Sequence, residues 1–166
     1  PWMCNKGRDL AAVFGRVRAE QPMLKGRPVD MPAAIANARA LIRAARHPVA
    51  LVSSWASNEE LASFKSALGD VFASYVKADV APAPGETLCD DVLIRPDKNP
   101  NRAGACALFG ADAPRYAADT DLVLVWGEGA DFGALPRGAR IILLNSWLQP
   151  ENGHADVFFP ISAQTE

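Results

Sequence analysis

The chain has 166 residues, of which 49% are hydrophobic and 22% are charged, a composition that excludes a disordered protein and suits one ordinary domain. No apolar run reaches the ~18 residues of a transmembrane helix, so direct insertion into a membrane is not expected. The net charge of -2 is unevenly divided, with +6 on residues 1–46 and -8 on residues 47–166. A nucleic-acid-binding domain would be basic as a whole, so no nucleic-acid partner is expected.

Residues 1–30 are predicted to form an irregular basic arm, because glycines and prolines recur there without an apolar period. One short helix is expected within the arm, near residues 9–19. The sequence opens at Pro1 without an initiator methionine or the features of a signal peptide. We therefore expect a piece of a longer protein.

Apolar residues recur with a helical period after Asp30. Asp30 suits the N-cap of this helix, and Pro32 suits its first turn. The predicted helix ends before Pro48, because a proline disfavours helical geometry in the residue preceding it. Its apolar face is predicted to consist of Ile35, Ala38, Leu41, Ile42 and Ala45.

Residues 49–54 form a short apolar run that predicts a strand buried on both faces. Ser57 and Glu60 then form a capping box at the start of a helix that ends near Gly69. Residues 71–76 predict a second strand, and residues 79–100 a long proline-rich loop. The remaining predicted elements are a short helix at 101–109 and strands at 121–127, 140–145 and 156–160.

Apolar strands that alternate with amphipathic helices predict an α/β fold over residues 31–166: a doubly wound, mainly parallel sheet with helices on both faces. Ligands of such sheets bind beyond the carboxyl ends of the strands. Three polar or glycine-rich segments follow predicted strands, at residues 53–57, 127–129 and 145–147. They predict a polar site at one edge of the sheet, although strand ends also need turn residues.

The glycines at 127, 129 and 133 resemble a phosphate-binding turn, but their spacing misses the dinucleotide fingerprint by one position. A structural turn is the preferred interpretation. His47, His154 and the adjacent Asp90 and Asp91 show no spacing typical of a catalytic or zinc site. No catalytic residue is therefore assigned.

The three cysteines, Cys4, Cys89 and Cys106, are too widely spaced for a disulfide framework, which favours a reducing compartment. Cys89 and Cys106 are interpreted as small apolar side chains. Cys4 is followed by Lys6 and a glycine turn, a pattern that suits a ligand of an anionic iron–sulfur cluster. A [4Fe–4S] cluster needs four ligands, so three cysteines would have to come from outside this chain.

Five segments, in this order, resemble the molybdopterin oxidoreductase superfamily, and within it the family of the large iron–sulfur subunit of NADH-quinone oxidoreductase (respiratory complex I). The segments are residues 2–8, 53–61, 97–104, 120–127 and 155–160. The resemblance implies that Cys4 is the last ligand of a [4Fe–4S] cluster and that Lys6 lies between cluster and pterin. It implies that residues 1–30 are the last part of an iron–sulfur domain and that residues 31–166 are a truncated Rossmann-like domain.

The chain also departs from the catalytic members of that superfamily. The Asp-Pro-Arg that grips the pterin dinucleotide is replaced by Asn145-Ser146-Trp147, and no clear molybdenum ligand is found. These losses suit the complex I branch, in which bound molybdopterin is not expected. The resemblance then implies a cofactor-free scaffold for electron transfer from NADH to quinone. Its partners would be other subunits of the respiratory complex, in the cytoplasm at the inner membrane.

Two alternatives remain open. In a catalytic, formate dehydrogenase-like enzyme, Lys6, Ser54, Gly127 and Gly129 would contact the pterin dinucleotide. Its guanine would lie near Asn145 and Ser146. In a stand-alone binding module, Trp55 and Trp147 would flank a cleft for a small ligand or a partner.

Overall fold

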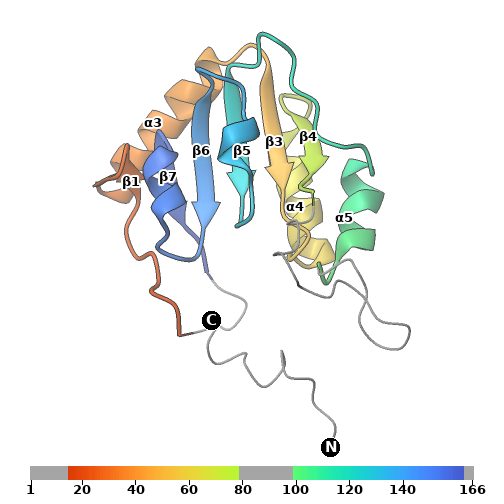
Figure 1. Cartoon of the computed structure of the whole chain (residues 1–166), viewed down its shortest axis with the longest axis horizontal. Helices are drawn as coiled ribbons and strands as arrows, with labels where there is room; N and C mark the ends of the chain where they lie inside the picture. The colour runs from red at the N-terminus through yellow and green to blue at the C-terminus, as the bar shows by residue number, and fades with distance from the viewer. Residues whose placement is uncertain (1–14, 79–98, 163–166) are drawn as a thin grey trace, which may run out of the picture.

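A seven-stranded mixed sheet organises the residues that the computed structural model describes, 15–78 and 99–162 (Figure 1). The strands are β1 (Met23–Leu24), β2 (Arg27–Pro28), β3 (Pro48–Val52), β4 (Ala73–Val76), β5 (Leu122–Trp126), β6 (Arg140–Asn145) and β7 (Val157–Pro160). β4, β3, β5, β6 and β7 lie parallel in that order. β1 pairs antiparallel with β7 and β2 with β1. The predicted α/β class and mainly parallel sheet are confirmed.

The parallel part of the sheet has the strand order 2-1-3-4-5 of a doubly wound fold, counted from β3. Chain direction across the sheet reverses after β4, so the topological switch point lies between β3 and β5. β3 is buried at all five positions, because its neighbours β4 and β5 hydrogen-bond both of its edges and layers cover both of its faces. The switch point is where such sheets bind ligands.

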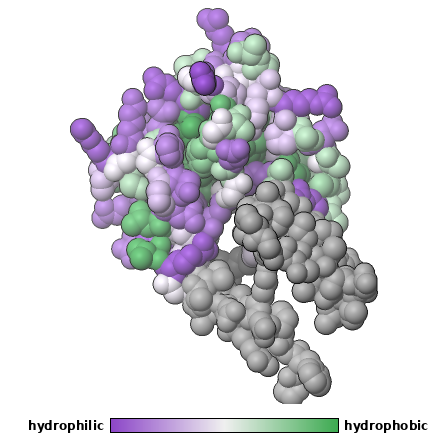
Figure 2. All heavy atoms as spheres, viewed as in Figure 1, coloured by the Kyte–Doolittle hydropathy of each residue, from purple (hydrophilic) through white to green (hydrophobic). Residues whose placement is uncertain are grey.

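Helices cover both faces of the sheet, but unequally. Three α-helices, α3 (Met31–Ala44), α4 (Asn58–Leu68) and α5 (Arg102–Phe109), pack on the face that carries Ala50, Leu124 and Val52. The other face is covered by two 3-10 helices, η1 (Phe132–Ala134) and η2 (Pro150–His154), and irregular segments (Figure 1). Figure 2, viewed from that thinly covered side, shows hydrophobic residues between hydrophilic ones near the middle of the face. None of the helices in the described ranges could span a membrane.

The arm differs from its prediction. β1 and β2 form a hairpin within the segment predicted to be irregular. Its two central residues, Lys25 and Gly26, both have positive φ, as in a type I′ turn. Residues 15–19, the described part of the short helix predicted at 9–19, are not helical. They run beside the segment after β6 instead, where Arg18 forms a bridge with Trp147.

The predicted apolar face of α3 is confirmed except at one position, because Ala38, Leu41, Ile42 and Ala45 all pack in or against the core. Ala34 and Ala38 are buried, whereas Ile35 is 38% exposed, so Ile35 does not belong to the core face. The close approach of α3 to the sheet favours the two small alanines over the larger isoleucine. The other predicted helices and strands match within about two residues, as expected for helix and strand boundaries. The predicted loop at 79–100 lies outside the described residues except for its last two positions.

The capping box of α4 is confirmed. The Ser57 Oγ accepts the Glu60 amide at 3.2 Å, and a Glu60 carboxylate oxygen accepts the Ser57 amide at 2.8 Å. This cap fixes the turn that leads from the end of β3 into α4. It thereby fixes the backbone that follows β3, at the carboxyl edge of the sheet next to the switch point.

Ser57→Ala is expected to lower the free energy of unfolding by about 1 kcal/mol, because it leaves the Glu60 amide without its acceptor. Urea unfolding followed by circular dichroism measures this change. Ser66→Ala is the matched control, since Ser66 is exposed within the same helix and should change stability little. Equal destabilisation by both substitutions would contradict the capping role.

Candidate functional site

Three polar segments meet at the carboxyl edge of the sheet. We call Ser53 and Ser54 after β3, Lys77 after β4, and Gly127 and Glu128 after β5 the switch-point cluster. A Cβ placed on Gly127 would lie 3.3 Å from the Ser53 Oγ and 3.4 Å from the Lys77 Nζ. The sequence-based prediction that these strand ends form one polar edge is therefore confirmed for the segments that begin at residues 53 and 127.

Lys77 is the buried cation of this cluster, with only 8% of its surface exposed. Its Nζ donates a hydrogen bond to the Glu128 carbonyl, the one acceptor that the described residues offer to its three N–H donors. Its backbone is fixed as well, since its amide donates to the Val52 carbonyl at 3.0 Å and its carbonyl accepts from Arg102 at 2.8 Å. Burial lowers the pKa of Lys77 from 10.5 to about 8, while the Glu128 charge opposes that shift.

Gly127 allows the β5 turn to approach Lys77 closely. Its φ of +77° favours glycine, and its amide donates to the Leu144 carbonyl at 2.7 Å. Gly129 also has positive φ, at +81°. Both glycines therefore shape the turn, which agrees with the structural interpretation of this motif.

Glu128 connects the ends of three strands with the segment before β1. Its carboxylate accepts hydrogen bonds from Arg16 at 2.8 Å and from Gln149 at 3.2 Å, while its carbonyl accepts from Lys77. Gln149 also accepts from the Asn145 side chain at 3.2 Å. The outer side of the switch-point cluster is thus linked by contacts within the chain.

Asn145 and Ser146 are also engaged by this chain. Asn145 is 3% exposed, and its Oδ1 accepts the Ser146 amide at 2.7 Å. The Ser146 hydroxyl donates to the Ser162 carbonyl at 3.0 Å, and the Ser146 carbonyl accepts from Arg18 at 2.6 Å. These polar groups are therefore engaged in contacts within the chain.

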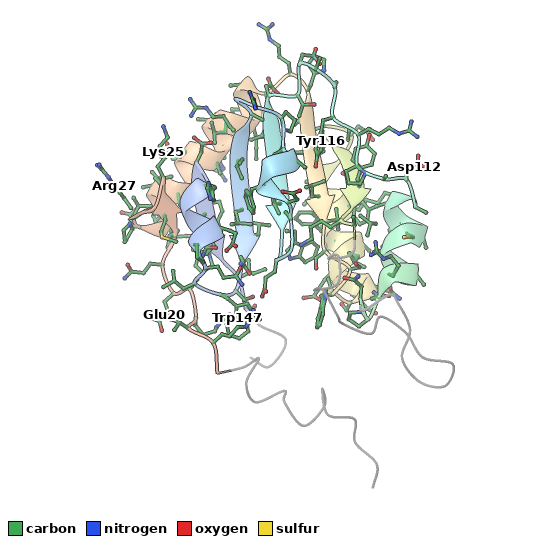
Figure 3. All side chains as sticks on the ribbon, viewed as in Figure 1. Glu20, Lys25, Arg27, Asp112, Tyr116 and Trp147 are labelled. Atoms are coloured by element: carbon green, nitrogen blue, oxygen red, sulfur yellow. The ribbon has the colours of Figure 1, made fainter. Side chains whose placement is uncertain are left out.

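Trp147 is covered rather than open. It is 7% exposed, and the guanidinium carbons of Arg16 and Arg18 lie 4.4 Å and 5.1 Å from its ring centroid, a cation–π arrangement. Figure 3 shows Trp147 below the carboxyl end of the sheet, next to the segment of the chain that carries these arginines. Because Trp55 is 55% exposed and Trp147 is buried, the predicted cleft flanked by both tryptophans is not formed.

The other predicted positions do not build a site. Cys4, Lys6, Cys89, Asp90 and Asp91 lie outside the described residues. The His47 Nε2 lies 3.0 Å from an Asp119 carboxylate oxygen at the exposed surface, and the His154 ring stacks on Phe132. Cys106, within α5, is a half-buried free thiol that packs against the core cluster shared with α4. Within residues 15–78 and 99–162, no group of three or more His, Cys, Asp or Glu side chains could hold a metal ion.

Lys77, Arg16 and Gln149 were not predicted. Lys77 could have been found, because a lysine that directly follows an apolar strand of a parallel sheet lies at the ligand-binding edge. Arg16 and Gln149 lie 112 and 21 residues from Glu128 along the chain. No local pattern marks such pairs.

In comparisons with known proteins, no family model, curated protein or solved structure matches this chain. The resemblance to molybdopterin oxidoreductases therefore rests on the residues of the chain alone.

Proposed function

We propose that this chain is a non-catalytic α/β scaffold within an iron–sulfur oxidoreductase of the complex I type. The observation that carries the scaffold role is Glu128, whose carboxylate and carbonyl are held by Arg16, Gln149 and Lys77. Contacts within the chain thus engage the turn after β5, next to the switch point where a related ligand-binding domain would contact its ligand.

Electrostatics supports this proposal. A dinucleotide at a switch point places its pyrophosphate against the glycine turn after a strand. Here that turn carries the Glu128 carboxylate, which repels an anion, and the side chains of Asn145 and Ser146 are used internally. A pterin dinucleotide therefore fits these residues poorly, as expected for a branch that has lost the cofactor.

The oxidoreductase part of the proposal rests on the ordered motif resemblance, in which Cys4 and Lys6 belong to an iron–sulfur domain. The described end of the arm supports it, because Arg16 and Arg18 anchor that segment on Trp147. In an assembly that supplies the remaining cysteines, this anchor would fix the cluster-bearing segment against the sheet. The α/β domain would then position the cluster without touching a substrate.

An affinity tag on the chromosomal copy tests this proposal. On a native gel, the tagged chain should migrate with a large complex that shows NADH-dependent tetrazolium reduction. The isolated chain should contain no iron and give no reduced-cluster EPR signal. Migration apart from all NADH-oxidising activity would contradict the complex I part of the proposal, and a reducible cluster in the isolated chain would refute the cluster interpretation.

A second candidate function, binding of a pterin or nucleotide dinucleotide, is favoured by Lys77. Its Nζ has one acceptor among the described residues, and the buried Ser54 lies after the neighbouring strand β3. A buried cation with free donors is a typical anion partner. GDP and inorganic pyrophosphate are suitable probes in a thermal-shift titration. A saturable rise of about 5 °C that disappears in Lys77→Met would favour this function over the scaffold.

A further inference from the structure

A second site candidate lies at the opposite, amino end of the parallel strands. A surface cavity of about 620 Å³ opens between the β1–β2 hairpin, α3 and the starts of β6 and β7. We call it the amino-edge cavity. Its volume is within the range of small-molecule sites, about 300–1,000 Å³. It shares no residue with the switch-point cluster, so it is independent of the proposed function.

The floor of the amino-edge cavity is apolar and belongs to the folded core. It is formed by Leu24 of β1, Leu41 of α3 and Val157 of β7. Val157 is 1% exposed, and the other two pack against the same core cluster. A floor of this kind is already formed before a ligand binds, which lowers the entropic cost of binding.

The rim of the cavity is cationic. Lys25, Arg27 and Arg140 face a single carboxylate, Asp156. That carboxylate is already engaged, since it accepts Arg140 at 2.7 Å and the Ile141 amide at 3.0 Å. Lys25 and Arg27 project from the hairpin at the edge of the molecule (Figure 3), and neither side chain has an ion-pair partner among the described residues. The rim therefore carries a net positive charge.

Lys25 occupies a backbone position that its residue type disfavours. Its φ is +49°, the only positive φ of a non-glycine residue in the described ranges. The first central position of a type I′ turn favours Asn, Asp or Gly. The Lys25 amide donates to the Asp156 carbonyl at 3.2 Å, which ties the turn to the cavity wall. A cation at a strained position beside a cavity is a reason to look for a ligand.

We propose that the amino-edge cavity binds a small organic anion, a molecule with a carboxylate or phosphate group on an apolar body. The apolar body lies on Leu24, Leu41 and Val157. The anionic group is held by Lys25, Arg27 and the donors of Arg140 that Asp156 leaves available. Asp156 acts as a positioning residue, because it fixes the Arg140 guanidinium against the wall.

NMR titration of the isotope-labelled chain tests the proposal, with phenyl phosphate and benzoate as the two anionic probes. At least one of them should shift the amide signals of Leu24, Lys25 and Val157 in a saturable manner. Inorganic phosphate tests charge alone and benzyl alcohol tests apolar contact alone, and both should bind at least about ten times more weakly. Comparison of the two aromatic probes shows whether the site prefers a phosphate or a carboxylate.

Lys25→Asn is the most informative variant. Asparagine tolerates positive φ better than lysine, so the variant should fold with equal or higher stability yet bind the preferred probe about five times more weakly. Arg27→Gln should weaken binding similarly. Arg39→Gln is the matched control. Asn37 and Leu41 of α3 both line the cavity, and Arg39 lies two residues from each of them and so on the other side of the helix.

Three results would overturn the proposal. The first is the absence of saturable shifts with either aromatic anion. The second is an equal loss of affinity in Arg39→Gln, which would indicate attraction to the general surface charge. The third is equal binding of inorganic phosphate without shifts at Leu24 and Val157, which would indicate only a counter-ion at the rim.

Discussion

Replacing Lys77 with methionine is expected to raise the free energy of unfolding at pH 7 by about 2 kcal/mol. Lys77 is 8% exposed, and burial lowers its pKa from 10.5 to about 8. At pH 7 the buried side chain is still charged, so the folded state carries a desolvation cost that methionine removes. The lost hydrogen bond to the Glu128 carbonyl offsets part of that gain.

The pH dependence distinguishes this explanation from improved packing. Between pH 8 and pH 10.5 the unfolded chain binds more protons at Lys77 than the folded chain does. The stability of the native sequence therefore rises with pH in this window, relative to the variant, by up to about 3 kcal/mol. The higher free energy of unfolding of Lys77→Met relative to the native sequence should have its full value below pH 8 and should disappear by about pH 10.5.

Urea unfolding of both proteins at pH 7, 9 and 10.5 measures the difference. Lys65→Met is the matched control, because the Lys65 ammonium also donates to a backbone carbonyl, that of Leu108, but its side chain is exposed. The control should change stability by less than about 1 kcal/mol. A Lys77→Met protein that is less stable than the native one at pH 7 would show that the buried ammonium is net stabilising.

The outcome bears on function as well as on stability. Perturbed lysines held in low-dielectric surroundings concentrate at functional sites, although structural networks perturb them too. If Lys77 destabilises the fold, its position at the switch point has no structural benefit. The nucleotide titrations then become the decisive comparison between the scaffold and the dinucleotide-binding domain.

The parallel strands and the helix caps were predictable because their signals are local. The run at β3 is apolar throughout since both faces are covered, and the Ser57–Glu60 box lies within one turn. The β1–β2 hairpin was missed because two-residue strands gain their stability from pairing with β7, far along the chain. The contacts of Glu128 were missed for the same reason.

The candidate site was only partly predictable from the sequence. Strand ends located Ser53 and Gly127, because carboxyl ends of parallel strands meet at one edge. The sequence did not show that Glu128 is held by residues of the chain itself, nor that Arg16 and Arg18 cover Trp147. Both depend on how residues 15–19 pack beside the segment after β6, which is a tertiary contact without a local pattern.

Trp147→Ala is expected to lower the free energy of unfolding by about 3 kcal/mol, the usual cost of removing a buried aromatic side chain. Trp147 is 7% exposed and packs beneath Arg16 and Arg18. Its loss also removes the surface on which residues 15–19 rest. Residues 15–19 should then detach before the sheet unfolds, since the sheet core does not include Trp147.

Limited trypsin digestion reports this detachment directly, because trypsin cleaves after arginine. In the native chain, the bond after Arg18 is protected: the Ala19 amide donates to the Ser146 carbonyl at 3.0 Å, and Ala19 is 5% exposed. In Trp147→Ala, mass spectrometry should find a fragment that begins at Ala19 at least about ten times sooner, in line with a loss of local stability. Trp55→Ala is the matched control, since Trp55 is 55% exposed and should alter neither stability nor cleavage strongly. Native-like protection of Ala19 in Trp147→Ala would show that the hydrogen bonds to Ser146, rather than the stacked arginines, hold the arm on the sheet.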